Sequence, residues 1–153
     1  MNIILNYYYI YNLFKNCKPI QIINYLNNYE NINQLNSILK IENIYGITPL
    51  NILFQNIYID KSIVLYIIKN FDIINIANKF KLVPIHYAIQ YLNNSNKKIL
   101  KLIIDNTNLI NVNDLFGNNI YHNFVYFDRE FSYNYIKYIF YKYKIKNYNI
   151  KNK

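Results

Sequence analysis

Three segments of this chain repeat one another at an almost constant spacing. NIYGITPLNIL at 43–53 aligns with NKFKLVPIHYA at 78–88 and with DLFGNNIYHNF at 114–124, at shifts of 35 and 36 residues. A second set of segments keeps a shift of 36: IVLYII at 63–68, ILKLII at 99–104 and YIKYIF at 135–140. Repeats of roughly 20–50 residues are typical of proteins in which each unit stacks on its neighbours. The spacing therefore predicts repeats over 43–77, 78–113 and 114–147.

Each unit carries the pattern of a short helix, a loop and a second helix. Thr48-Pro49 suits a helix start, because the hydroxyl accepts a hydrogen bond from a free N–H and proline is harmless in the first turn. Pro84 occupies the same place one unit later. Apolar residues recur at the i, i+3, i+4 spacing of a helix face: Ile63, Tyr66 and Ile67 in one unit, Ile99, Leu102 and Ile103 in the next. Two short helices cannot bury such a face alone, so the sequence predicts an all-α solenoid of stacked helix-turn-helix units.

Residues 1–42 are predicted to form a degenerate N-terminal capping repeat and a linker. YYYIYNLFKN and IQIINYLNN flank Pro19, which is expected to begin the second helix of this pair. Terminal repeats of solenoids are commonly atypical, because they cover the end of the core. The pattern leaves open whether 28–42 forms an extra helical turn or a loose loop.

The segment Asn-Ile-Tyr-Gly-Ile-Thr-Pro-Leu at 43–50 is close to D-x-x-G-x-T-P-L-H, and in this the chain resembles the ankyrin repeat family. The resemblance implies two antiparallel helices in each unit, with short finger loops between units. It also implies structural roles, such as helix-start hydrogen bonds of the histidines, for a set of motif residues. These are Gly46, Thr48, Pro49, Pro84, His86, Gly117 and His122.

Two positions depart from the family motif. Lys81 occupies the glycine position of the second unit, which costs up to about 1 kcal/mol if the turn keeps a positive φ there. The third unit has Asn119-Ile120 in place of Thr-Pro, so the start of its first helix is less well defined.

The composition argues against several classes of enzyme. With glycine only at Gly46 and Gly117, no glycine-rich loop can surround a phosphate. One cysteine and two histidines cannot build a thiolate cluster or a multi-histidine zinc site. Cys17 is interpreted as inert packing, with a reactive thiol as the alternative. No nucleophile, base and orienting group can be assembled, so we expect no catalysis, no metal, no cofactor and no small-molecule substrate.

Ankyrin proteins generally bind other proteins through their fingers and first helices, so the resemblance implies a protein partner. Tyr45, Phe80 and Phe116 fall at the same finger position and are the candidate partner-binding residues. Packing of each ring on the adjacent finger is an equally good interpretation of this pattern. No F-box-like segment follows the repeats, which favours a blocking adaptor or competitive decoy over a recruiting one.

The cellular setting is also an expectation. Isoleucine and asparagine make up 61 of 153 residues, which indicates a very AT-rich genome. Together with the resemblance, this suggests a large DNA virus, such as a poxvirus or giant virus, or an intracellular parasite or symbiont, and a modulator of a host pathway. The apolar runs are far shorter than the roughly 20 residues of a membrane span. We therefore expect an intracellular, cytoplasmic protein with no membrane contact.

An alternative function rests on the C-terminal end. The net charge is +9, and six lysines but no acid follow Glu130. Lys142, Lys144 and Lys146 alternate with aromatic and apolar residues before a basic tail at 148–153. Such a strip could bind nucleic acid or an acidic surface. The interpretation that we favour is a solvated chain end with no function.

Overall fold

The computed structural model describes residues 3–92, 96–108, 112–127 and 132–143. Within these residues the chain is all-helical, with nine helices and no strand, which confirms the all-α part of the predicted fold class. The helices are α1 (Ile3–Asn16), α2 (Pro19–Asn27), α3 (Ile32–Leu39), α4 (Pro49–Leu53), α5 (Lys61–Asn70), α6 (Pro84–Tyr91), α7 (Lys97–Asn106), α8 (Ile120–Tyr126) and α9 (Ser132–Tyr143).

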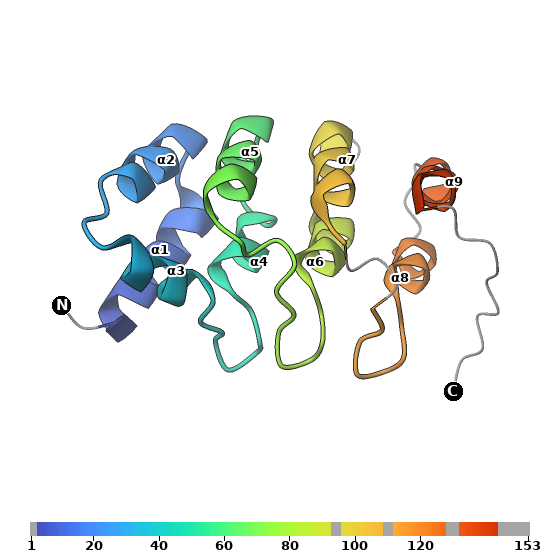
Figure 1. Cartoon of the computed structure of the whole chain (residues 1–153), viewed down its shortest axis with the longest axis horizontal. Helices are drawn as coiled ribbons and strands as arrows, with labels where there is room; N and C mark the ends of the chain where they lie inside the picture. Colours follow the sequence, from blue (N-terminus) through green and yellow to red (C-terminus); the bar gives the residue numbers. More distant parts are fainter. Residues whose placement is uncertain (1–2, 93–95, 109–111, 128–131, 144–153) are drawn as a thin grey trace.

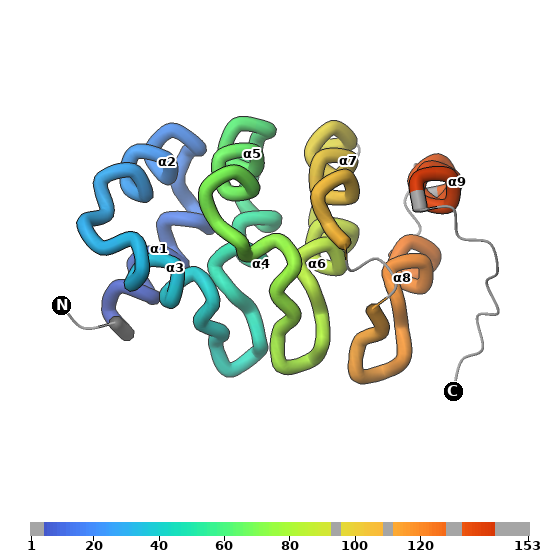
Figure 2. The backbone as a smooth tube through the Cα atoms, viewed as in Figure 1, coloured from blue at the N-terminus to red at the C-terminus, as the bar shows by residue number. Residues whose placement is uncertain are grey.

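The helices are arranged as pairs that stand side by side along the molecule (Figure 1). The first helices of the pairs form one row, in which α1 contacts α4, α4 contacts α6 and α6 contacts α8. The second helices form another row, in which α2 contacts α5 and α5 contacts α7. Each of the three predicted repeats therefore contains one helix pair. Three loops project from the same edge of the molecule, before α4, α6 and α8 (Figure 2).

The core lies between the rows, where the predicted apolar faces are buried. Ile63 and Ile67 of α5 are fully buried, and so is Ile103 of α7. Ile99 is also buried, while Tyr66 and Leu102 are half-buried at the edge of the same faces. Burial of a large aliphatic side chain contributes about 1.5–3 kcal/mol, so these faces bind successive pairs together.

The helices begin where the local chemistry satisfies their first N–H groups. Thr48 caps α4, with its hydroxyl accepting from the N–H of Asn51 at 3.3 Å. Pro19 and Pro84 are the first residues of α2 and α6, as predicted. In the third unit the side chain of Asn119 accepts from the N–H of Tyr121 at 3.0 Å. Asparagine thus replaces threonine as the cap, and α8 begins at the expected place without a proline.

Part of the undecided segment 28–42 is helical. Asn31 caps α3 by accepting from the N–H of Gln34 at 3.0 Å. Leu35, Ile38 and Leu39 on one face of α3 are buried, and the helix contacts α1. The extra residues therefore add apolar contacts to the N-terminal pair.

Candidate functional site

The three loops that project from one edge of the molecule share one backbone geometry. We call residues 43–48 finger 1, residues 78–83 finger 2 and residues 114–119 finger 3. In each finger the first residue donates its N–H to the carbonyl of the fifth and accepts from the N–H of the fourth, over 2.8–3.1 Å. The fourth residue has a positive φ, which is 71° at Gly46, 59° at Lys81 and 82° at Gly117. Lys81 thus has the positive φ for which we expect a loss of stability.

The first residue of each finger also fixes the turn with its side chain. Asn78 Oδ1 accepts from the N–H groups of Phe80 and Leu82, at 3.0 and 2.9 Å. Asn43 and Asp114 make the equivalent pairs of bonds in fingers 1 and 3. A side-chain oxygen at this position closes the loop locally, so the fingers keep their shape although their remaining residues differ.

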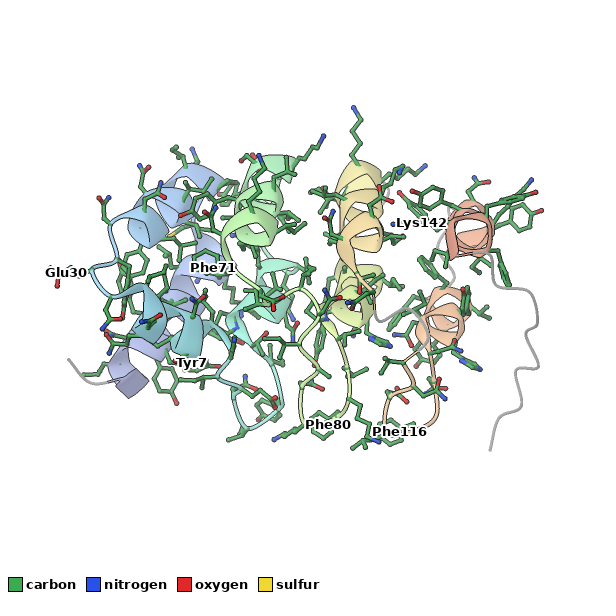
Figure 3. All side chains as sticks on the ribbon, viewed as in Figure 1. Tyr7, Glu30, Phe71, Phe80, Phe116 and Lys142 are labelled. Carbon is green, nitrogen blue, oxygen red and sulfur yellow. The ribbon has the colours of Figure 1, made fainter. Side chains whose placement is uncertain are left out.

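The candidate aromatic residues are equivalent in position but not in environment. Tyr45 is 68% exposed and Phe116 is 81% exposed. Phe80 is half-buried, because its ring lies against finger 1, where a Cβ on Gly46 would meet two ring carbons at 2.8 Å. Figure 3 shows Phe80 and Phe116 on neighbouring fingers at the same edge of the molecule. Packing on the adjacent finger therefore describes Phe80, while Tyr45 and Phe116 are exposed and stay candidates for partner binding.

Fingers 1 and 2 are joined by side chains as well as by ring packing. Asn78 Nδ2 donates to the carbonyl of Gly46 at 2.7 Å. The N–H of Lys79 donates to the carboxylate of Glu42 at 3.0 Å. Between fingers 2 and 3, the N–H of Leu115 donates to the carbonyl of Phe80 at 3.1 Å. Because Asp114 carries a carboxylate where finger 2 has an amide, it cannot donate to finger 2 as Asn78 donates to finger 1.

Both histidines take part in starting their helices. The N–H of Val83 donates to His86 Nδ1 at 3.2 Å, and the N–H of Asn119 donates to His122 Nδ1 at 3.1 Å. His86 is buried, and its burial lowers its pKa despite the opposing effects of Val83 and Asp114. These bonds are the kind of structural role that the sequence assigned to both side chains.

A cavity of about 600 Å³ lies between α6 and α8. Its walls are formed by one finger residue from each side, by consecutive turns of the two helices and by the residue after α8. The lining residues are Leu82, His86, Tyr87, Gln90, Asn118, Tyr121, His122, Asn123, Val125, Tyr126 and Phe127. None of them is an acid, a lysine or an arginine. Apart from the two histidines, the sequence analysis missed this site, because the helical periodicity marks core faces but not the surface between two helices.

The basic residues of the alternative function are only partly described. Lys142 lies in α9 (Figure 3), where its Nζ is 3.1 Å from Asp105 Oδ1 and from the carbonyl of Ile104. Lys142 thus joins α9 to α7. Lys144, Lys146 and the tail at 148–153 lie outside the described residues.

Asp105 is the centre of a polar cluster between α7 and α9. Lys101 Nζ lies 2.8 Å from its carboxylate and 2.8 Å from the hydroxyl of Tyr138, which also donates to Asp105. Partial burial alone would raise the pKa of Asp105, but the hydrogen bonds from Lys101, Tyr138 and Lys142 lower it to about 2. The cluster therefore holds a carboxylate that is charged at neutral pH.

Other candidate chemistry is sparse in the described part of the chain. Cys17 is half-buried and packs against the core, and its carbonyl accepts from Asn56 Nδ2 at 2.8 Å. Among the residues that the structure describes, no group of three or more histidine, cysteine or acidic side chains is placed to hold a metal ion. No helix in the same residues is long and apolar enough to cross a membrane.

Comparison with known proteins adds no relative: no protein-family model matches the chain, and no curated protein matches it significantly.

Proposed function

We propose that this chain is an ankyrin-type repeat protein that docks a partner protein, acting as an adaptor or competitive decoy without catalysing a reaction. Three features support this proposal. The sequence units have one register, each unit contains a helix pair, and the fingers repeat the same hydrogen bonds. The resemblance to ankyrin proteins is also the basis for proposing that the chain works in the cytoplasm, and in a host cell if its origin is viral.

The observation that carries the proposal is the exposure of Tyr45 and Phe116 on fingers whose backbones are held rigidly. A protein interface gains most from aromatic side chains that bury a large area and lose little rotamer freedom. The turn bonds of Asn43 and Asp114 fix the two fingers before a partner arrives. The two fingers therefore lose less conformational entropy when a partner binds, which favours affinity. The ring of Phe80 packs against Gly46 of finger 1.

The proposal assigns no catalytic step, and both histidines and Asp105 make structural contacts. Nδ1 of each histidine accepts from the backbone at a helix start. Asp105 is paired with Lys101 and Lys142. A metal or cofactor is likewise not part of the proposal.

Affinity capture with double and single variants tests this function. We expect the wild-type chain to capture a defined protein from lysate of the host cell, and the purified partner to bind with at least tenfold lower affinity after Tyr45→Ala and Phe116→Ala are combined. Ile57→Ala is the matched control, because Ile57 is 86% exposed between α4 and α5, away from the fingers. The affinity of the Ile57→Ala variant for the purified partner should stay within twofold of the wild-type value.

A different outcome would support the alternative function. If capture is sensitive to nuclease, falls steeply with salt and is lost in a chain that ends at Lys142, the basic tail binds nucleic acid. Binding that is unchanged in the double variant contradicts docking through the fingers.

A further inference from the structure

The helices α7 and α9 carry an excess of positive charge. Together they contain one acid, Asp105, and five lysines, which are Lys97, Lys98, Lys101, Lys137 and Lys142. Asp105 is shared between Lys101 and Lys142, so one negative charge faces two positive ones. Among the described residues, Lys98 and Lys137 are exposed and form no ion pair. The positive charge of this surface is therefore only partly balanced.

Lysines and tyrosines of the two helices form one continuous surface. We call it the basic face and define it by Lys98, Lys101, Lys137, Tyr138 and Tyr141. Lys101 Nζ lies 4.3 Å from the centre of the Tyr138 ring, which joins the α7 side of the face to the α9 side. Lys137 Nζ lies 6.0 Å from the centre of the Tyr141 ring. Residues three or four apart are neighbours on a helix surface, so Lys98 extends the face beyond Lys101, and Tyr141 lies beside both Lys137 and Tyr138.

The basic face lies apart from the residues that we propose for docking. In Figure 1, α7 and α9 stand on the side of the molecule opposite to the three fingers. The face also consists of helical residues and does not include the tail at 148–153. A ligand bound here would leave Tyr45 and Phe116 accessible to a partner protein.

The equivalent contact between α2 and α5 is neutral. Tyr66 stands at the position of Tyr138 one helix pair after α2, and its hydroxyl donates to Asn27 Oδ1 at 2.6 Å. In the aligned segments, Leu65 occupies the position of Lys101 and Lys137. Helix α2 contains no charged residue. The lysines are thus concentrated at one end of the row, although the whole chain is rich in lysine.

Exposed rings accompany the lysines of α9. Tyr133 and Tyr141 are each 73% exposed. Among the described side chains of α7 and α9, no other large apolar residue is exposed. A helix that lies on a membrane surface presents a face of tryptophan, phenylalanine or leucine, and the outer sides of these two helices have no such face.

Lysines beside exposed aromatic rings fit a single-stranded nucleic acid better than a protein. Protein interfaces are enriched in arginine and depleted in lysine, whereas every cation of α7 and α9 is a lysine. Lysine binds phosphate well as a point charge. Unpaired bases stack on aromatic side chains whatever their sequence. In a duplex the faces of the bases are already stacked on one another, so an exposed ring such as that of Tyr141 would gain little.

We propose that the basic face binds single-stranded nucleic acid, with phosphates at Lys98, Lys101 and Lys137 and a base stacked on the ring of Tyr141. This function is additional to docking through the fingers and does not depend on it. Contacts to phosphates and to base faces carry no sequence information. Binding is therefore expected to be independent of sequence and to weaken as salt is added.

The contribution of the lysines is tested by fluorescence anisotropy of a labelled oligothymidylate of about twelve nucleotides. The full chain should bind it with a Kd of about 1–100 μM at low salt. Lys98→Ala combined with Lys137→Ala should weaken binding at least tenfold and reduce the slope of log affinity against log salt by about 1–2. The matched control combines Lys61→Ala with Lys69→Ala, which removes two exposed lysines from α5. Affinity should then change less than threefold.

Variants of Tyr141 separate stacking from charge. Tyr141→Ala should weaken oligothymidylate binding at least fivefold and leave the salt slope unchanged, because a base loses the ring on which it stacks. Tyr141→Phe keeps the ring and should bind within twofold of wild type. Tyr45→Ala is the control at a site of similar exposure, 68%, on finger 1, and should leave the affinity unchanged. Because Tyr141 is exposed, neither of its variants should change the Tm.

A crosslink locates the contact in the wild-type chain. Ultraviolet light couples 5-iodouracil to an aromatic side chain that lies against it. With an oligonucleotide that contains this base, peptide mapping by mass spectrometry should find the crosslink at Tyr141 and none at Tyr45.

Several results would overturn the inference. These are no binding of oligothymidylate, equal losses in the two double-lysine variants, tighter binding of a duplex than of the single strand, and equally good competition by polyglutamate. Binding that is lost in the chain ending at Lys142 but kept in the Lys98/Lys137 variant would assign the nucleic acid to the basic tail instead. None of these results changes partner capture through Tyr45 and Phe116. The inference and the proposed function can therefore fail separately.

Discussion

At the scale of single residues, the fingers show how one backbone shape is kept by different side chains. The fourth finger position has a positive φ in every unit, although one of its three residues is a lysine. Left-handed backbone costs a residue with a Cβ about 1–2 kcal/mol. Lys81 tolerates it because Asn78 holds the turn from both sides, through Oδ1 within finger 2 and through Nδ2 to finger 1.

Alanine at the two glycines should separate backbone strain from steric conflict. Gly117→Ala is expected to lower the free energy of unfolding by about 1 kcal/mol, because φ is 82° and an added Cβ has no neighbour within 4 Å. Gly46→Ala should cost about 1 kcal/mol more, since its Cβ meets the Phe80 ring at 2.8 Å. Urea unfolding measures both variants. Lys81→Gly is the reverse control and should stabilise by about 0.5–1 kcal/mol. Equal losses at the two glycines would contradict the ring contact.

The stability of the fold should depend on the hydrogen-bond donor of the Asn78 amide, which an aspartate of the same shape lacks. Asn78→Asp keeps the acceptor for finger 2 but loses the donor to Gly46 and Tyr87, at 2.7 and 3.0 Å. A buried carboxylate would then face a carbonyl, so we expect a loss of about 2–3 kcal/mol at neutral pH in urea unfolding. Asn43→Asp keeps both turn bonds of finger 1 and should cost less than about 0.5 kcal/mol. Similar losses in the two variants would refute a role for the Asn78 donor.

At the scale of elements, α9 is joined to α7 differently from the way in which α7 is joined to α5. Buried aliphatic faces join α5 to α7, whereas a cluster of ion pairs and tyrosine hydroxyls joins α7 to α9. Tyr135 adds a bond from its hydroxyl to the carbonyl of Lys97. On the α9 side, Ile139 is the fully buried aliphatic residue among the described side chains. Polar contacts that are partly open to water contribute less than buried apolar area, so the contact of α9 with α7 is weaker than that of α5 with α7.

The stability that Asp105 gives to the docking of α9 should therefore fall at acid pH. Its pKa in the folded chain, about 2, lies below the ordinary value of 3.8, so the charged carboxylate stabilises the fold above about pH 4. This contribution is lost as the pH falls from 4 toward 2. Asp105→Asn should lower stability by about 1 kcal/mol at pH 7, a figure that allows for partial exposure. Thermal unfolding of both proteins should converge near pH 2. A difference that is independent of pH would contradict this assignment.

At the scale of the whole molecule, stability comes from contacts between neighbouring pairs. The N-terminal pair is tied to the next by Asn56, whose Nδ2 donates to the carbonyls of Phe14 and Cys17, both at 2.8 Å. The middle pairs are covered on two sides, because α5 contacts both α2 and α7. In such a row, each unit is stabilised mainly by its own packing and by its immediate neighbours.

Hydrogen exchange should reveal this gradient along the chain. Amides of α9 are expected to exchange at least tenfold faster than those of α5, because α9 lies at the end of the described row and its contacts with α7 are polar. Deuterium uptake followed by mass spectrometry measures both helices in one experiment. Asp105→Asn should accelerate α9 further and leave α5 unchanged. Uniform protection along the chain would indicate a single cooperative unit.

The sequence by itself determined the helical class, the register of its repeated segments and the places where helices begin. These properties depend on interactions over a few residues, such as the helix starts at Thr48 and Pro84 and the apolar faces of period 3.6. The alignment of the repeated segments marked the aromatic position and both histidines, but not the side-chain oxygens that close the finger turns. The sequence did not decide between a helix and a loop at 28–42, because one possible cap, Asn31, and one short apolar face do not distinguish the two.

Only the tertiary structure decided which equivalent residues differ in role. Phe80 is half-buried against finger 1 while Tyr45 and Phe116 are exposed, and Asn78 donates to finger 1 through an amide that Asp114 lacks. The cavity arises between two helices, α6 and α8. Contacts between neighbouring units are made by residues that differ from one unit to the next. A repeat pattern describes only what the units have in common, so it does not predict these contacts.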